Sequence, residues 1–264
     1  MTLWFLCLLL QAAPASRLAA LELTTPARRL ELPRALQEVS GLVRLPEGVL
    51  LAHGDEEAVW MAVDVRTGAA VPHLALGAPA RGDFEATASA EGRLWLLASD
   101  GTMLDAPATA TGRVARPGVH AGSSDCELES LAWLPERGEF LAACKTGARR
   151  GWLAFRVRRP SDRTWRESPL AVSHDAIRDA GGPDGFSTSD MLFDAHTGHL
   201  LLLAGPERAL LEITPTGTVV AARRLTRKLH PQPEGLALLP DGSLAIADEA
   251  RGGGRLTLYA PAPK

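Results

Sequence analysis

Five acidic residues recur along the chain, each at the start of a short apolar stretch. They are Glu38, Glu85, Glu129, Asp190 and Glu234, and successive members lie 47, 44, 61 and 44 residues apart. If five equivalent strands carry them, the carboxylates converge on one axis, where each raises the pKa of its neighbours unless a cation is bound. Such a ring suits Ca²⁺, which takes six to eight oxygen ligands. The pattern predicts a channel site for Ca²⁺ or a small ligand; alternatively, each acid only hydrogen-bonds the backbone of the neighbouring unit.

A second group of charged residues follows the second apolar stretch of several units. These secondary candidates for the mouth of the same channel are Asp55, Glu56, Asp100, Lys145, Asp248 and Glu249. Lys145 is the positive member and could act as an internal counter-ion, which weakens the argument for a metal. The acids near 55 and 248 would form one patch if the first and last units are neighbours in space.

The elements that must position these residues form a repeat. A turn glycine follows each of the five acids by 7 to 10 residues, and a second apolar stretch follows the turn. Units of about 45 to 60 residues with four short strands are typical of β-propeller blades. We therefore predict an all-β, five-bladed propeller. Six blades would need an extra blade inside the 61-residue unit, whose excess is better explained by a polar insertion at 158–165 and a glycine-rich loop at 181–185.

The two ends of the ring are predicted to join through the amino-terminal strand. The last unit ends after its third strand at Tyr259, whereas the segment 21–32 has no partner. Ala27–Leu30 repeats the sequence of Ala222–Leu225, which belongs to a fourth strand. The amino-terminal strand should therefore complete the final blade. Helix is expected only as a short turn at 174–179.

The first 15 residues have the pattern of a secretory signal peptide. An apolar run at Leu3–Leu10 is followed by Ala13-Pro-Ala15, a small-x-small cleavage pattern. We expect residues 16–264 to form one propeller domain, periplasmic or secreted, with no transmembrane segment in the mature chain. Cys126 and Cys144 would then be the remaining cysteines, and they could form a disulfide or stay as buried thiols.

The overall charge excludes some classes of partner. The 28 basic and 31 acidic residues give a net charge of −3, so the chain has no electrostatic footprint for nucleic acid or an anionic membrane surface. We expect a monomer that binds a small molecule or a protein at the channel mouth.

Four phrases carry a resemblance to a known family. They are Glu38-Val-Ser-Gly-Leu42, Glu129-Ser-Leu-Ala-Trp133, Asp190-Met-Leu-Phe-Asp-Ala-His-Thr-Gly-His-Leu200 and Pro233-Glu-Gly-Leu-Ala-Leu-Leu-Pro-Asp-Gly-Ser-Leu244. Together they resemble the SdiA-regulated protein family, which is similar to phytase-like and esterase-like propellers. The resemblance runs from about Glu38 to Tyr259. It implies an exported or envelope-associated propeller that binds Ca²⁺, without a firmly assigned activity.

Two functions compete at this point. The first is a non-catalytic binding or scaffolding propeller whose channel mouth holds Ca²⁺ or a small ligand. The second is a metal-dependent hydrolase of an ester, lactone or phosphoester, in which the cation activates water and a free carboxylate acts as the base. No histidine lies at any of the five acid positions, which favours the binding module slightly. Catalytic residues cannot be assigned from the sequence.

Overall fold

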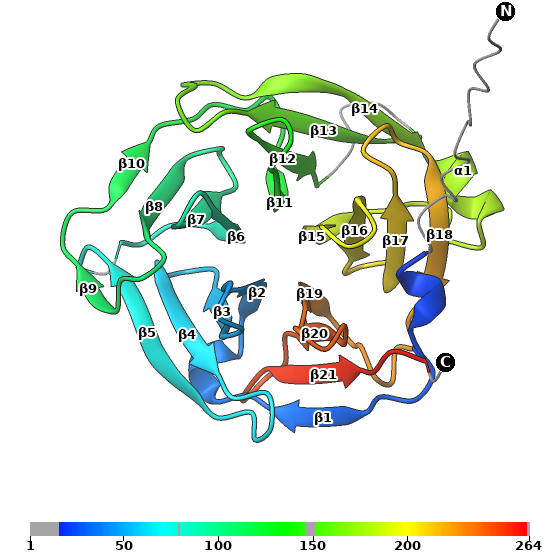
Figure 1. Ribbon diagram of the computed structural model, residues 1–264, viewed down its shortest axis with the longest axis horizontal. Coiled ribbons are helices and arrows are strands. Elements are labelled where there is room, and N and C mark those ends of the chain that lie inside the picture. The colour runs from blue at the N-terminus through cyan, green and yellow to red at the C-terminus, as the bar shows by residue number, and fades with distance from the viewer. Residues whose placement is uncertain (1–15, 79, 146–150, 263–264) are drawn as a thin grey trace, which may run out of the picture.

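The computed structural model describes residues 16–78, 80–145 and 151–262, and the proposed signal peptide lies outside them. Five antiparallel sheets stand around a central axis, like the blades of a propeller (Figure 1). The predicted five-bladed propeller is confirmed. Within the described residues, no helix is long and apolar enough to cross a membrane.

Most strands follow one another from the axis outwards within each blade. Blade I contains β2 (Val39–Arg44), β3 (Leu50–Gly54), β4 (Val59–Val63) and β5 (Ala70–Leu76). Blade II contains β6 (Phe84–Ala90), β7 (Arg93–Ala98), β8 (Met103–Pro107) and β10 (Gly118–His120). Blade III contains β11 (Leu128–Leu134), β12 (Glu139–Cys144), β13 (Trp152–Arg158) and β14 (Arg166–Ser173). Blade IV contains β15 (Thr188–Asp194), β16 (His199–Ala204), β17 (Ala209–Ile213) and β18 (Val219–Arg224). Blade V contains β19 (Pro233–Leu238), β20 (Leu244–Asp248), β21 (Arg255–Tyr259) and β1 (Arg28–Glu31).

The amino-terminal strand closes the ring as predicted. In Figure 1, β1 runs along the outer edge of β21, and the two pair from Arg28 with Leu258 to Glu31 with Arg255. A second link joins blades I and II, because β9 (Gly112–Val114) leaves blade II and pairs in parallel with β5. Segments distant in sequence thus hold the circle together.

Helices are confined to short connections. The α-helix α1 (His174–Asp179) covers the residues predicted for it, and the Ser173 hydroxyl caps it by accepting the Ala176 N–H at 3.1 Å. Two single-turn 3₁₀ helices, η1 (Leu18–Ala20) and η2 (Arg34–Leu36), flank β1.

The hydrophobic core lies between neighbouring blades. Between blades III and IV, for example, Leu141 and Phe155 belong to the same buried cluster as Leu202 and Leu211. Equivalent clusters fill the other four interfaces around the ring. Each side chain of this size contributes about 1.5–3 kcal/mol when fully buried. This packing fixes the innermost strands, which carry the candidate site.

The polar insertion at 158–165 is exposed in its middle and buried at both ends. Its first residue, Arg158, is buried and donates to the Gly101 carbonyl at 3.2 Å. Its last residue, Trp165, is also buried and donates from Nε1 to the same oxygen at 2.9 Å. The insertion therefore fastens blade III to blade II.

Candidate functional site

Every innermost strand contains a β-bulge near its first residue. The register shifts leave one extra residue in each strand, and these bulge residues are Ser40, Glu85, Glu129, Ser189 and Glu234. A bulge bends the strand and redirects a side chain. The three bulge glutamates interact electrostatically with one another and so lie at one end of the channel. We call this end the acidic mouth.

Two of the five predicted acids do not share this position. Glu38 lies two residues before the bulge of β2 and is exposed, and Asp190 lies one residue after the bulge of β15 and is buried. Serines hold the bulge position in those two blades. The predicted ring of five equivalent carboxylates is therefore replaced by three glutamates and two serines.

Glu38 instead belongs to an outer set of acids that sequence reasoning missed. Each member lies two residues before a bulge, and the set comprises Glu38, Asp83 and Glu127. The signal was present in the sequence, because these acids lie 45 and 44 residues apart. The mouth thus carries an inner layer of carboxylates from blades II, III and V and an outer layer from blades I, II and III.

Burial and mutual repulsion disfavour ionisation in the inner layer. Burial is the largest effect on Glu85, and Glu129 and Asp83 add to it, raising the pKa of Glu85 to about 8. For Glu234, burial and then the charges of Glu129 and Glu249 raise the pKa to about 7. Burial also raises the pKa of Glu129. At neutral pH Glu85 is therefore mostly protonated, and Glu234 is close to half-ionisation.

Lys145 neutralises one of the three bulge glutamates. Its Nζ lies 2.8 Å from Oε1 of Glu129, and its side chain is 48% exposed. The hydrogen bond to Glu129, followed by the charges of Glu129, Glu85 and Glu127, raises the pKa of Lys145. Lys145 is thus positioned as the internal counter-ion that its positive charge predicted.

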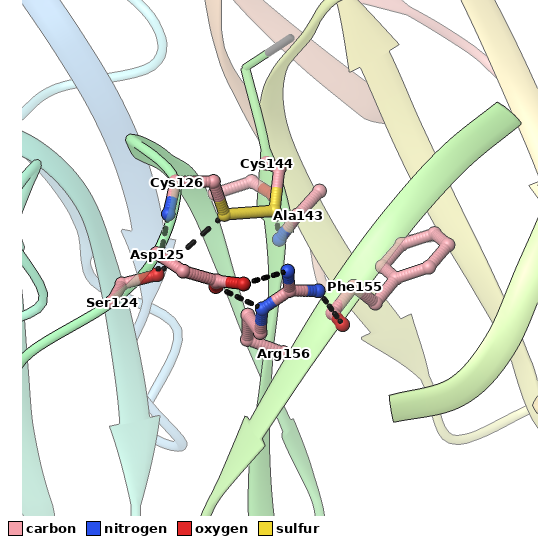
Figure 2. The surroundings of a disulfide bond; sticks show 8 residues. Ser124, Asp125, Cys126, Ala143, Cys144, Phe155 and Arg156 are labelled. Atoms are coloured by element: carbon pink, nitrogen blue, oxygen red, sulfur yellow. Dashed lines mark hydrogen bonds and ion pairs between the residues drawn. A yellow bond between two sulfur atoms is a disulfide. The ribbon is translucent and has the colours of Figure 1, made fainter. Parts of the chain in front are cut away.

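A disulfide bond supports the segment that carries Lys145. Cys126, which precedes β11, is bonded to Cys144, the last residue of β12 (Figure 2). Of the two possibilities left open by the sequence, the disulfide is the one observed. Because Glu127 and Lys145 directly follow the two cysteines, the bond ties together two charged positions of the mouth.

Blades I and V bring further acids to the mouth. Burial raises the pKa of both Asp55 and Glu249, and the charges of Glu38 and Asp55 add to the effect on Glu249. Glu56 is exposed, and its charge helps to raise the pKa of Asp55. The predicted meeting of the first and last units is therefore observed for these acids.

Two other predicted mouth residues have local structural roles. Asp100 is exposed and accepts the Thr102 N–H at 2.8 Å within the turn after β7. Asp248 is fully buried and lies 2.8 Å from Nδ1 of His230, whose Nε2 is 2.7 Å from the Tyr259 hydroxyl. Asp248 therefore lies in the core and not on the surface of the mouth, which corrects its prediction as a mouth residue.

Asp190 holds three innermost strands together. Its carboxylate accepts backbone N–H groups from Met191 at 2.8 Å, Leu236 at 2.6 Å and, more distantly, Leu42 at 3.5 Å. Burial raises the pKa of Asp190 well above its usual range, and the three N–H groups act in the opposite direction. For this residue the geometry matches the structural alternative, an acid bonded to the backbone of neighbouring blades.

Beyond this level the channel becomes mainly apolar. A cavity of about 240 Å³ is lined by the innermost strands, and Trp133, Phe193 and Leu238 are among its lining residues. The channel therefore has a chemically distinct end, whose lining residues include no acidic side chain.

The acidic mouth has the donor chemistry for Ca²⁺ but does not form a finished cage. Carboxylate oxygens are suitable ligands. Among the described residues, however, no group of three or more His, Cys, Asp or Glu side chains is arranged to hold one metal ion. The ammonium group of Lys145 also forms an ion pair with Glu129. A metal ion would therefore have to displace Lys145 and draw the glutamates together.

The bulge glutamates of blades III and V lie in the part of the chain that carries a family signature. Residues 123–251 match the SdiA-regulated family. This match confirms the resemblance over a shorter range than the sequence phrases indicated. The matched segment includes Glu129, Lys145, Asp190 and Glu234, whereas Glu85 lies outside it. No curated protein matches the chain.

Solved structures resemble the whole propeller at low sequence identity. Glutaminyl cyclase from Myxococcus xanthus aligns with a TM-score of 0.60 and 16% identity, covering 90% of this chain and 97% of that chain. The PQQ-bound aldose sugar dehydrogenase from Streptomyces coelicolor aligns with a TM-score of 0.55 and 12% identity, covering 89% and 97%. At such identities the likeness establishes the fold alone.

The raised pKa of Glu85 predicts a pH-dependent stability. The folded-state pKa of about 8 lies above the unfolded value, so the folded state binds more protons between the two values. The free energy of unfolding should therefore fall as the pH rises from about 4.5 to 8, by about 1–2 kcal/mol after allowance for solvent screening. Glu85→Gln should remove this part of the slope in urea titrations without added metal. Glu47→Gln, an exposed hairpin variant, should retain it, and an unchanged slope in Glu85→Gln would contradict the prediction.

Proposed function

We propose that the protein is a monomeric binding module whose acidic mouth holds a cation outside the cytoplasm. The cation is Ca²⁺ or a positively charged group on a small molecule or protein ligand. The observation that carries the proposal is the convergence of Glu85, Glu129 and Glu234 from three equivalent bulges.

The electrostatic state of the mouth supports this proposal. Lys145 pairs with Glu129, whereas Glu85 and Glu234 have pKa values near neutrality because burial and like charges oppose their ionisation. A bound cation would stabilise their ionised forms, since an opposite charge within about 4–6 Å lowers a carboxyl pKa. Binding should therefore release protons near neutral pH.

The disulfide supports a location in the periplasm or outside the cell. Disulfides form and persist in oxidising compartments and are rare in the cytosol. The Cys126–Cys144 bond is compatible with the signal peptide proposed for residues 1–15. Both point to a mouth that meets ligands outside the cytoplasm.

Calcium binding can be tested through its competition with Lys145. If Ca²⁺ takes Glu85, Glu129 and Glu234 as ligands, removing the ammonium by Lys145→Met should tighten binding about tenfold, equivalent to about 1.4 kcal/mol. Isothermal titration of the chelator-treated chain measures this change. Lys228→Met is the matched control, because Lys228 is exposed and has no part in the proposed site.

Two results would count against the calcium proposal. The first is an absence of binding at millimolar Ca²⁺ in both the wild type and Lys145→Met. The second is binding that survives Glu85→Gln combined with Glu234→Gln. A titration with a polyamine then tests the organic cation, and the same double substitution should abolish its binding.

A hydrolase is the second candidate, and one observation favours it. Glu85 and Glu234 have pKa values of about 8 and about 7, the range in which a carboxyl group can both donate and accept a proton at neutral pH. The candidate reaction is metal-dependent hydrolysis of an ester, lactone or phosphoester. A panel of these substrates with Ca²⁺ tests it. Activity that falls at least about 100-fold in Glu85→Gln or Glu234→Gln would support it.

A further inference from the structure

The first described residues of the chain are bound by a buried carboxylate. Glu212 is the last residue but one of β17 and is fully buried. Its carboxylate accepts the Ser16 hydroxyl at 2.6 Å, the Arg17 N–H at 2.9 Å and the Leu18 N–H at 2.9 Å. Nδ1 of His199 lies 2.7 Å from the same carboxylate. Three consecutive residues thus converge on one acid about 200 positions away.

Neighbouring groups fix the same segment in place. The Arg17 guanidinium donates to both carboxylate oxygens of Asp194, at 2.8 and 3.3 Å. The Leu18 side chain is buried in the apolar cluster between blades IV and V, with Leu210 and Tyr259. The segment 16–18 is therefore a built part of blade IV.

Glu212 is not a feature of the propeller repeat. The strand register places it at the position of Ala62, Val157 and Leu258 in blades I, III and V, all of them apolar. In blade II the equivalent residue is Asp105, which forms an ion pair with Arg93 and lies 2.9 Å from Nε2 of His120. Each of the two buried acids at this position therefore depends on its own partners, and those of Glu212 are His199 and the residues that follow the predicted cleavage point.

We propose that Glu212 is the receptor for the mature amino terminus, created when a signal-peptidase-type protease cuts between Ala15 and Ser16. Water adds across that peptide bond, leaving a carboxylate on Ala15 and an amine on Ser16 that is protonated at neutral pH. The Ser16 hydroxyl is 2.6 Å from Oε2 of Glu212. Covalent geometry then keeps the Ser16 nitrogen within roughly 6 Å of that oxygen.

Cleavage therefore supplies a positive charge beside a buried negative one. Before cleavage the Ser16 nitrogen is an uncharged amide, and Glu212 has His199 as its other ionisable hydrogen-bond partner within the described residues. The hydrogen bonds from Ser16, His199, Leu18 and Arg17 lower the pKa of Glu212 against the effect of its burial. Glu212 is thus ready to pair with an ammonium group. The processed chain should be more stable than the precursor. The less stable precursor would be easier to unfold for export.

A thermodynamic cycle tests this proposal on the purified propeller. One chain begins at Ser16 and the other at Ala15, each released from a fusion by a protease that leaves no extra residue. At pH 7 the chain beginning at Ser16 should melt about 3 °C above the chain beginning at Ala15, the shift that an ion-pair contribution of about 1 kcal/mol produces in a chain of this size. Glu212→Gln should remove the difference, whereas the exposed control Glu136→Gln should preserve it.

Equal melting temperatures for the two wild-type chains, or a difference that survives Glu212→Gln, would overturn the proposal. If Glu212→Gln fails to fold, acylation of the Ser16 α-amine in the wild type decides the question. The proposal expects labelling at least about tenfold slower than in the unfolded chain, and equal rates would overturn it. Amino-terminal sequencing of the exported protein should begin at Ser16, and any other first residue would also overturn the proposal.

Discussion

Replacing Asp190 by alanine is expected to lower the free energy of unfolding by about 3–5 kcal/mol, the cost of leaving buried N–H donors without their acceptor. The carboxylate accepts N–H groups from β15, β19 and β2, which belong to three different blades. Alanine would leave these donors buried beside the channel without a partner. The melting temperature should fall by about 6–20 °C.

Asp190→Asn keeps an acceptor oxygen at the same position. The asparagine carbonyl can still accept one or two N–H groups, so the expected cost is lower, about 1–2 kcal/mol. Asp179→Ala, at the exposed end of α1, is a control that should change stability by less than about 0.5 kcal/mol. Urea unfolding measures all three variants. A cost below about 1 kcal/mol for Asp190→Ala would show that the carboxylate does not hold the strands.

Features that depend on local chemistry were predictable from the sequence. The hairpins follow from turn glycines between apolar stretches, and α1 follows from a polar segment with a capping serine at Ser173. The closure by β1 was also visible, because Ala27–Leu30 repeats a fourth-strand sequence. These signals are short in range or repeated, and therefore need no knowledge of the packing.

The site itself was predictable only in part, because one residue of register decides where a side chain points. Glu85, Glu129 and Glu234 were identified and do share one position. Glu38 and Asp190 were grouped with them by spacing, but the bulges fall on Ser40 and Ser189 instead. No residue type marks a bulge of this kind, so spacing alone could not place it.

Long-range partners were the other missing information. In the sequence, Asp248 follows an apolar stretch as the mouth acids do. In the structure it is buried and hydrogen-bonded to His230. Arg158 opens a polar segment but is buried against carbonyls of blade II. Such partners come from other parts of the chain, and only the assembled ring brings them together.

Loss of the Cys126–Cys144 bond is the other change with a large expected effect. The bond closes a loop with a sequence separation of 18 residues. In the chain-entropy model a loop of this length contributes about 3 kcal/mol, so Cys126→Ser combined with Cys144→Ser should lower the melting temperature by about 6–12 °C. Wild-type protein in a strong reductant should approach the same value, and the double variant should not respond to the reductant.

The loss of stability on removing the disulfide should be limited, because another contact holds the same segment. The Arg156 guanidinium donates to both carboxylate oxygens of Asp125, at 2.7 and 2.9 Å, directly beside the disulfide (Figure 2). This bidentate pair should keep blade III folded after reduction.

Reduction should still change the acidic mouth, because Lys145 directly follows Cys144 and would hold Glu129 less firmly without the disulfide. Added Ca²⁺ should stabilise Lys145→Met more than the wild type. If the disulfide positions the Lys145–Glu129 pair, this difference in stabilisation should become smaller after reduction. If the difference between wild type and Lys145→Met is the same before and after reduction, the disulfide stabilises the blade but does not position the charged residues of the mouth.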